Sequence, residues 1–164
     1  MNNLSSLLNS PMESGLRGLI ILEAGYPHAY DISRIVIYDY LLVHSGDAEC
    51  GPESIHPATP HRAGEMLVKR PILEQGVKYM MAKGLIIPHY TSNGIEYTAS
   101  EIASPFLDSL QADYTKKLIN VAHWVVETFD LYTEEDLHEL TNVNLTAWGG
   151  EFINESIVRG GITS

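Results

Sequence analysis

The 164-residue sequence has a single cysteine, Cys50, and no long apolar run. One thiol excludes an intrachain disulfide framework and suits a reducing compartment. No segment approaches the roughly 18 consecutive apolar residues that a transmembrane helix needs. The first residues, MNNLSSLLNS, lack the basic start and the apolar core of a secretion signal. These absences predict a cytoplasmic protein of bacterial type that does not contact a membrane.

Motifs that carry catalytic chemistry are also missing. The chain has no G-x-x-x-x-G-K-[ST] phosphate loop, no G-x-G-x-x-G after a strand and no G-x-S-x-G elbow. It has neither H-E-x-x-H nor a pair of C-x-x-C motifs. Such motifs place the backbone donors, nucleophiles or metal ligands that the chemistry requires. We therefore expect a protein that is not an enzyme and that needs no cofactor.

Positive charge is scarce and unevenly distributed. The chain has 10 Lys and Arg against 21 Asp and Glu, for a formal net charge of -11. Residues 1–100 carry ten carboxylates and seven basic side chains, which gives -3, and residues 101–164 carry eleven and three, which gives -8. An acidic second half repels phosphate at long range, so autonomous nucleic-acid binding by the whole chain is disfavoured.

The first half of the sequence predicts three helices and a hairpin. Apolar residues at helical spacing run from Met12 to Ile20, and Asp31 stands at an N-cap position before the helical segment 32–43. A third helix follows around residues 73–83. Asn93-Gly94 between two β-rich runs predicts a hairpin with a type I′ turn, and Pro88 predicts that its strand is an edge strand.

This order is that of a winged helix-turn-helix domain. We predict a mainly α (α+β) fold with a winged-helix-like domain over residues 11–112, which includes a long loop over residues 44–62. An unrelated small α+β domain is the alternative. A helical extension and tail follow over residues 113–164, with an amphipathic stripe from Leu118 to Phe129 and a capping box at Thr133–Asp136. The tail residues Trp148 and Phe152 either fold back or dock on another subunit.

The loop over residues 44–62 is the best candidate for a site. Zinc is one reading of it, with His44, Asp47, Cys50, His56 and His61 as ligands, but their spacing matches no standard zinc pattern. A shaped docking surface is the reading we favour, because three prolines stiffen the loop and reduce the entropy lost on binding. The predicted partner contacts are His44, Ser45, Gly46, Asp47, His56, Pro57, Thr59, Pro60 and Arg62, with Trp148 and Phe152 from the tail.

The segment after this loop is locally basic. The third helix of a winged helix can enter a DNA groove, so Lys69, Arg70, Lys78 and Lys83 are candidate DNA contacts. The plainer reading is that they are solvated charges on an ordinary helix. The helix has few side chains suited to base edges, and the hairpin has no Lys or Arg. A DNA-binding winged-helix transcriptional regulator is therefore the second functional hypothesis.

Several phrases resemble a known family. DYLLVHSGD (residues 39–47), GPESIHPATPHR (51–62) and GEMLVKR (64–70) resemble the middle component of bacterial ABC-three-component systems, as do PMESGLR (11–17) and MMAKGLII (80–87). The nearest kind is the small subunit of Lamassu-type anti-phage defence. The L-x-H-S-G-D and H-P-A-T-P phrases are the specific part, and the resemblance runs from about Pro11 to Phe129.

The resemblance implies a non-enzymatic accessory subunit with a winged-helix-like domain. Such a subunit would join an SMC-like ABC ATPase, which senses DNA, to an effector subunit such as a nuclease. It would reach DNA indirectly, through the complex. The resemblance carries over no catalytic residue, and the tail after Asn142 matches nothing in it.

Overall fold

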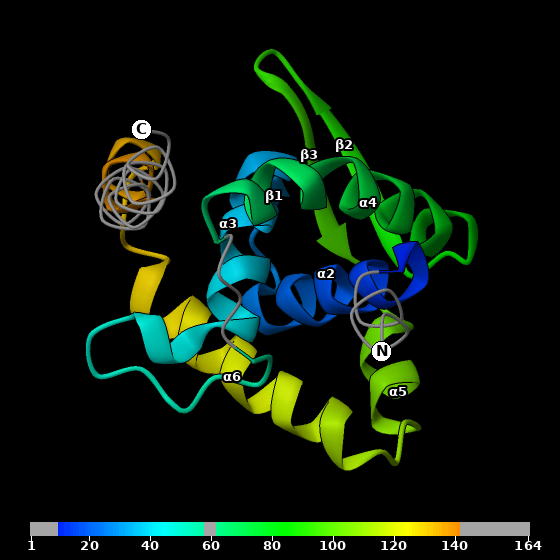
Figure 1. Cartoon of the computed structure of the whole chain (residues 1–164). Helices are drawn as coiled ribbons and strands as arrows, with labels where there is room; N and C mark the ends of the chain where they lie inside the picture. The colour runs from blue at the N-terminus through cyan, green and yellow to red at the C-terminus, as the bar shows by residue number, and fades with distance from the viewer. Residues whose placement is uncertain (1–9, 58–61, 142–164) are drawn as a thin grey trace, which may run out of the picture.

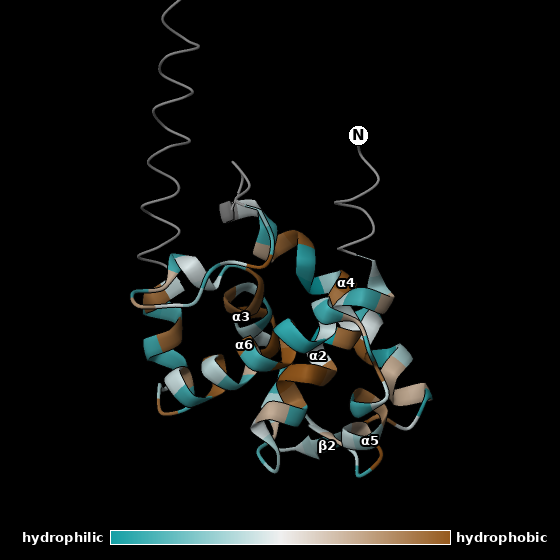
Figure 2. Cartoon of the chain, turned by 90° about the horizontal axis from the view of Figure 1, so that it is seen from below, coloured by the Kyte–Doolittle hydropathy of each residue, from teal (hydrophilic) through white to brown (hydrophobic). Residues whose placement is uncertain are grey.

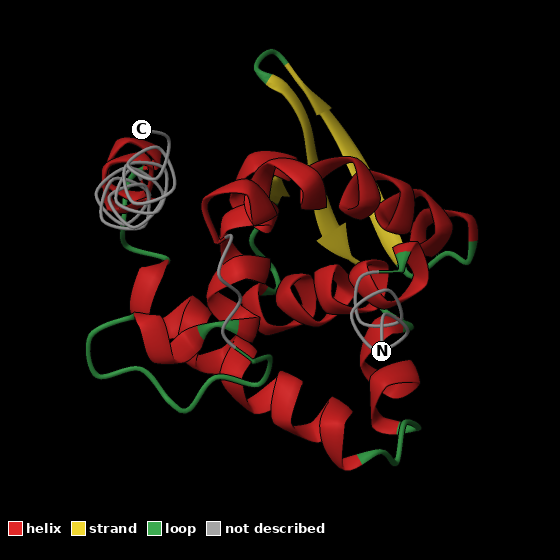
Figure 3. Cartoon of the chain, viewed as in Figure 1, coloured by secondary structure: helices red, strands yellow, loops and turns green. Residues whose placement is uncertain are grey.

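The computed structural model describes residues 10–57 and 62–141 of the chain. Within them the elements follow the predicted order of three helices with a hairpin after the third (Figures 1 and 3). Two further helices follow, and residues 134–141 are also helical. The bounds are α2 Pro11–Gly25, β1 Tyr30–Asp31, α3 Ile32–Val43, the 3-10 turn η1 Ser45–Asp47, α4 Arg62–Ala82, β2 Ile86–Thr91, β3 Gly94–Ala99, α5 Ala103–Asp108 and α6 Asp113–Phe129.

The sheet has the strand arrangement of a winged helix. Strand β1, between α2 and α3, pairs antiparallel with β3, and β3 pairs antiparallel with β2, so the order is β1-β3-β2. Tyr97 on β3 therefore faces Tyr30 on one side and Pro88 on the other. The prediction that Pro88 lies on an edge strand is confirmed. Together with the helices, this sheet confirms the mainly helical α+β, winged-helix-like fold.

Local capping signals start two helices where the sequence predicts. The Asp31 carboxylate accepts a hydrogen bond of 2.8 Å from the backbone N–H of Arg34 at the start of α3. The capping box at residues 133–136 forms in both directions. The Asp136 N–H donates to Thr133 Oγ1 over 3.1 Å, and the Thr133 N–H donates to Asp136 Oδ2 over 3.0 Å. These bonds satisfy N–H groups that a helix start leaves without an intrahelical acceptor.

Two local predictions need correction. The hairpin forms, but its turn residues are Ser92 and Asn93, because Thr91 pairs with Gly94. Positive φ falls on Gly94, at 125°, and not on Asn93, so the turn is not type I′. Helix α4 begins at Arg62, well before Leu73. The charged Lys69 occupies a buried position on the inner face of this early part, so an apolar period is absent there.

Helix α2 lies at the centre of the molecule and contacts α3, α4, α5 and α6 (Figure 1). Apolar residues concentrate on α2 and α3, which Figure 2 shows in brown. The core joins both predicted segments, because Leu118, Val125 and Leu137 from the second half pack with Leu19 and Ile35 from the first. In the part of the chain that the structure describes, no helix combines the length and the apolar character needed to cross a membrane.

Candidate functional site

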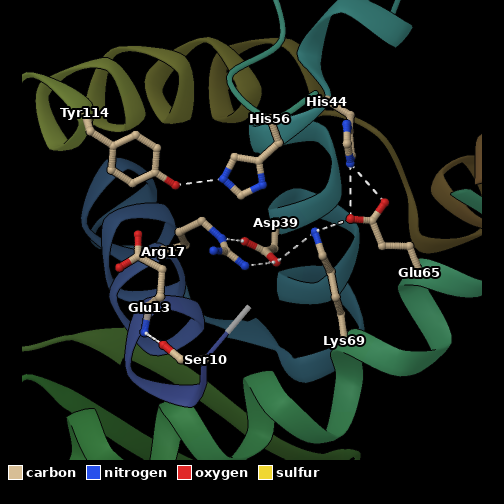
Figure 4. Close-up of polar contacts among 9 residues, drawn as sticks. All are labelled: Ser10, Glu13, Arg17, Asp39, His44, His56, Glu65, Lys69 and Tyr114. Carbon is tan, nitrogen blue, oxygen red and sulfur yellow. Dashed lines mark hydrogen bonds and ion pairs between the residues drawn. The ribbon is translucent and has the colours of Figure 1, made fainter. Parts of the chain in front are cut away.

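A buried ion pair between α2 and α3 forms the centre of the candidate site. The Arg17 side chain lies on α2 and the Asp39 side chain on α3, and both residues are 0% exposed. Arg17 Nε donates to Asp39 Oδ1 over 2.6 Å and Nη2 donates to Oδ2 over 3.2 Å (Figure 4). This paired geometry suits a guanidinium and a carboxylate better than any other combination of side chains.

The pair continues into a chain of charges that reaches α4 and the end of α3. Lys69 Nζ lies 3.9 Å from Asp39 Oδ2 and 3.1 Å from Glu65 Oε1, the latter an ion pair without well-aligned hydrogen bonds. Glu65 in turn lies 2.9 Å from His44 Nε2 through its Oε2 atom. His44 follows directly after α3, so the chain of contacts connects three helices to the start of the loop (Figure 4).

The other end of the loop, at His56, is attached beside these connected side chains, called the buried network below. His56 Nε2 lies 2.7 Å from the hydroxyl of Tyr114 in the first turn of α6, and the two rings are nearly parallel. The backbone N–H groups of Ile55 and His56 both donate to the Val43 carbonyl, over 3.1 and 3.0 Å. Residues 44 and 56 therefore lie next to each other, with ring centroids 6.4 Å apart. The segment 44–57, called the 44–57 loop below, is held at both ends.

Further hydrogen bonds close the 44–57 loop. The Tyr40 hydroxyl donates to Asp47 Oδ2 over 2.7 Å, and the Gly46 N–H donates to Ser54 Oγ over 2.9 Å. The Ser45 hydroxyl donates to the Glu53 carbonyl over 3.3 Å. Such a compact loop with neighbouring ends presents a pre-formed surface, which loses little entropy when it binds.

The charges of the network are balanced, and the pKa values reflect this. Burial acts against the charged forms of Arg17 and Asp39, yet their mutual attraction raises the pKa of Arg17 and lowers that of Asp39. Burial likewise acts to raise the pKa of Glu65, but the hydrogen bond from His44 and the charge of Lys69 lower it to about 2. The cations Arg17 and Lys69 thus pair with the carboxylates Asp39 and Glu65, and these ion pairs join α2, α3 and α4.

Neutral groups complete the network at the loop end. Burial, together with the positive charges of Arg17 and Lys69, lowers the pKa of His56 to about 4. Burial also raises the pKa of Tyr114 to about 12. At neutral pH the contact between His56 and Tyr114 is therefore a hydrogen bond between two uncharged groups.

Acidification should therefore destabilise the protein through His56. The unfolded chain takes up a proton on this histidine below about pH 6.5, whereas the folded chain does so only near pH 4. The free energy of unfolding should fall on the order of 2 kcal/mol between pH 6.5 and 4.5. Urea unfolding of the wild type and of His56→Gln across this range measures the effect.

The variant separates this effect from that of Glu65, whose contribution is lost only as the pH falls from about 4.5 towards 2. His56→Gln should unfold with a clearly smaller pH dependence between 6.5 and 4.5. An unchanged slope in the variant would assign the pH dependence to other groups.

The structure places the predicted partner contacts in different environments. His44, Ser45 and His56 are buried, and their side chains bond within the fold. Their predicted role as partner contacts stays a prediction. Gly46 and Pro57 are exposed, and Asp47 is half-buried. Thr59, Pro60, Trp148, Phe152 and the side chain of Arg62 lie outside the described residues.

The structure also places the predicted DNA contacts in different environments. Lys69 is 3% exposed and pairs with Glu65 in the interior, so it belongs to the buried network. Arg70, Lys78 and Lys83 are exposed on α4 and just after it. Arg70 bonds to Glu74 Oε1 over 3.3 Å and to Ser33 Oγ over 3.2 Å. Arg70 and Lys78 line a groove of about 390 Å³ between α4 and the hairpin.

The zinc reading of the loop finds no assembled ligand set. Among the residues that the structure describes, no group of three or more His, Cys, Asp or Glu side chains could hold a metal ion. His44 and His56 face Glu65 and Tyr114, and Cys50 lies exposed at the outer part of the loop with φ at 60°. The fifth predicted ligand, His61, is outside the described residues.

Sequence reasoning missed most of the buried network. Arg17, Asp39, Glu65 and Tyr114 were not predicted as site residues, although Arg17 and Asp39 stand inside the phrases that carry the family resemblance. A signal was present in the helical pattern. Arg17 lies just before the apolar run 19–22 and Asp39 lies within the mostly apolar run 35–43, and charged residues are almost never fully buried unless they are paired.

Comparison with protein-family models places the chain. Residues 7–151 match the family described as ABC-three component (ABC-3C) system Middle Component 2. The match covers most of the 164 residues and includes the whole buried network and the 44–57 loop. No curated protein and no solved structure matches the chain. This match confirms the predicted resemblance to an ABC-three-component middle component, and the chain belongs to the ABC-three component system Middle Component 2 family.

Proposed function

We propose that this chain is a non-enzymatic accessory subunit that links an SMC-like ABC ATPase to its effector in a cytoplasmic anti-phage defence complex of the Lamassu kind. The effector would be a nuclease, and the chain would reach DNA only through the complex. Membership of the middle-component family carries the proposal, because a middle component has an accessory role in a system of several subunits. The ATPase, the effector and the Lamassu relationship are the proposed steps beyond that membership.

The 44–57 loop supports a role in contact. A buried network of this extent is costly to assemble, because each charge loses its hydration. Here it ties α2, α3, α4 and α6 to both ends of one surface loop. A loop that is attached so firmly presents the same shape before and after binding, which suits a linking subunit. The exposed part of this loop is therefore the first candidate for a subunit contact.

A role as a DNA-binding regulator is less well supported. Of the four predicted DNA contacts, Lys69 is buried and Arg70 is engaged with Glu74 and Ser33. The hairpin strands β2 and β3 contain no Lys or Arg and one glutamate, Glu96. Phosphate contacts come mainly from Lys and Arg, so the exposed cations Lys78 and Lys83 alone form a weak DNA surface.

Co-expression with an SMC-like ATPase and an effector of the same three-component system tests the proposed function. The three chains should co-purify as one complex, and the isolated chain should show no catalytic turnover. Pro52→Ala with Pro57→Ala gives the 44–57 loop of the folded, free chain more conformations to lose on binding, and should weaken assembly by about threefold to tenfold. Pull-down yields and titration of the subunits measure the change.

Pro105→Ala is the matched control, since Pro105 is exposed in α5, far from the loop in the chain. It should leave assembly unchanged. If the chain stays a monomer when it is co-expressed with the ATPase and the effector, the proposed function is contradicted. Normal assembly of the loop variant would instead leave the accessory role in place and remove the loop from the interface.

A further inference from the structure

The chain turns a corner directly after α6, at residues 130–132, and presents apolar side chains to solvent there. Leu131 is 93% exposed and Tyr132 is 40% exposed. Together with Leu140 they line a shallow groove of about 580 Å³, whose other lining residues are Asp136 and Glu139. We call these five residues the corner surface. Nothing in the described part of the chain covers Leu131, which forms an apolar patch with Tyr132 and Leu140 beside two carboxylates, and such a patch marks a contact surface.

The corner is held rigidly. The hydroxyls of Tyr30 and Tyr38 both donate to Asp130 Oδ1, over 2.6 and 3.0 Å. Arg34 donates to the Tyr132 carbonyl over 2.6 Å, and the Tyr132 ring packs edge-on against Phe129 at 5.2 Å. Residues on both sides of Leu131 are therefore tied to β1, α3 and α6. The exposed leucine belongs to a pre-formed surface and not to a loosely attached loop.

The charge around the corner surface indicates what would bind it. Residues 130–141 contain five carboxylates and no Lys or Arg, and the nearby Arg34 is engaged with the Tyr132 carbonyl. Two of these carboxylates, Asp136 and Glu139, lie in the groove itself. A second copy of the chain would bring the same negative charge and would be repelled. A positively charged segment with an apolar face satisfies both properties of the surface.

We propose that the corner surface is the docking site for a basic amphipathic helix of a partner subunit. The leucine face of that helix would cover Leu131, Tyr132 and Leu140, and its Lys or Arg side chains would lie beside Asp136 and Glu139. The inference rests on the proposed function only in assuming partner subunits. It assigns a second contact surface, separate from the 44–57 loop.

A peptide experiment tests the binding chemistry on the full-length chain. The probe is a helix-forming peptide of leucine and lysine with its leucines on one face, compared with a scrambled peptide of the same composition. The wild type should prefer the amphipathic peptide, and Leu131→Asn should lose about tenfold in affinity, the size expected for truncating an anchor residue. Glu139→Lys should lose a similar factor, and added salt should reduce the wild-type affinity.

Matched variants separate docking from general effects. Leu67→Asn removes a leucine that is 80% exposed on α4, and Glu101→Lys reverses an exposed charge before α5. Both should bind the peptide like the wild type. Leu131→Asn should unfold at the same urea concentration as the wild type, because this side chain buries almost nothing. Equal binding of the two peptides by the wild type would overturn the inference, whatever the complex does.

The subunit complex provides the second arm. Leu131→Asn should weaken co-purification of one partner subunit, whereas Leu67→Asn should not. A normal complex with Leu131→Asn would overturn the inference and leave the proposed function intact. Failure of the wild type to form any complex would count against the proposed function, and the peptide arm would still decide the docking chemistry.

Two other occupants would also overturn the inference. A concentration-dependent dimer that Leu131→Asn abolishes would assign the corner surface to a second copy. Faster hydrogen exchange over residues 142–164 in free Leu131→Asn would assign it to the chain's own last residues. Sedimentation and hydrogen-exchange measurements of the two proteins distinguish these cases from partner docking.

Discussion

Asp39→Asn should lower the free energy of unfolding by about 3–5 kcal/mol, the usual effect of removing one member of a buried ion pair. The variant keeps the shape of the side chain but leaves Arg17 without its carboxylate and Lys69 with Glu65 alone. Both cations are buried, so water cannot compensate them. Urea unfolding followed by circular dichroism measures the change.

The exposed pair Arg70–Glu74 supplies the control. Its side chains are about half exposed, and their atoms are 3.3 Å apart. Arg70→Met should change the free energy of unfolding by less than about 0.5 kcal/mol, as surface pairs do. The double variant Arg17→Met with Asp39→Leu should regain much of the stability lost by Asp39→Asn, because it removes both buried charges. Equal effects of Asp39→Asn and Arg70→Met would contradict the conclusion that the buried ion pairs stabilise the packing of α2, α3 and α4.

Gly15→Ala should also destabilise the protein strongly, by about 3 kcal/mol. Helices α2 and α4 approach each other where Gly15 faces Gly76, and a Cβ atom on Gly15 would lie 2.5 Å from the Gly76 carbonyl oxygen. The obstacle is backbone, so the helices themselves must separate. This contact joins the helix that carries Arg17 to the helix that carries Lys69. Thermal and urea unfolding measure the cost.

Gly64→Ala is the matched substitution with the opposite expected sign. Gly64 lies in α4, and a Cβ atom there would meet nothing within 4 Å. Alanine should therefore stabilise the helix by about 0.5–1 kcal/mol, the ordinary difference in helix propensity. If Gly15→Ala were also neutral or stabilising, close backbone packing would not be what joins α2 to α4.

The fate of the loop residues shows where sequence reasoning reached its limit. The predicted loop over residues 44–62 contains real structure, but His44 and His56 face inward and its last residue already belongs to α4. Composition identified the segment as unusual and could not say which side chains were outside. The direction in which the loop's side chains point depends on contacts with Val43, Glu65 and Tyr114, which come from three separate elements.

The sequence by itself determined the order of helices and strands, the caps at Asp31 and Thr133, the edge position of Pro88 and the family phrases. These features depend on neighbours a few residues apart, so local periodicity and capping chemistry reveal them. Only the tertiary structure decided that Arg17, Asp39 and Lys69 are internal and that Leu131 is external. A charged side chain can be buried when an oppositely charged side chain on another helix pairs with it. A leucine stays exposed when no other element packs against it.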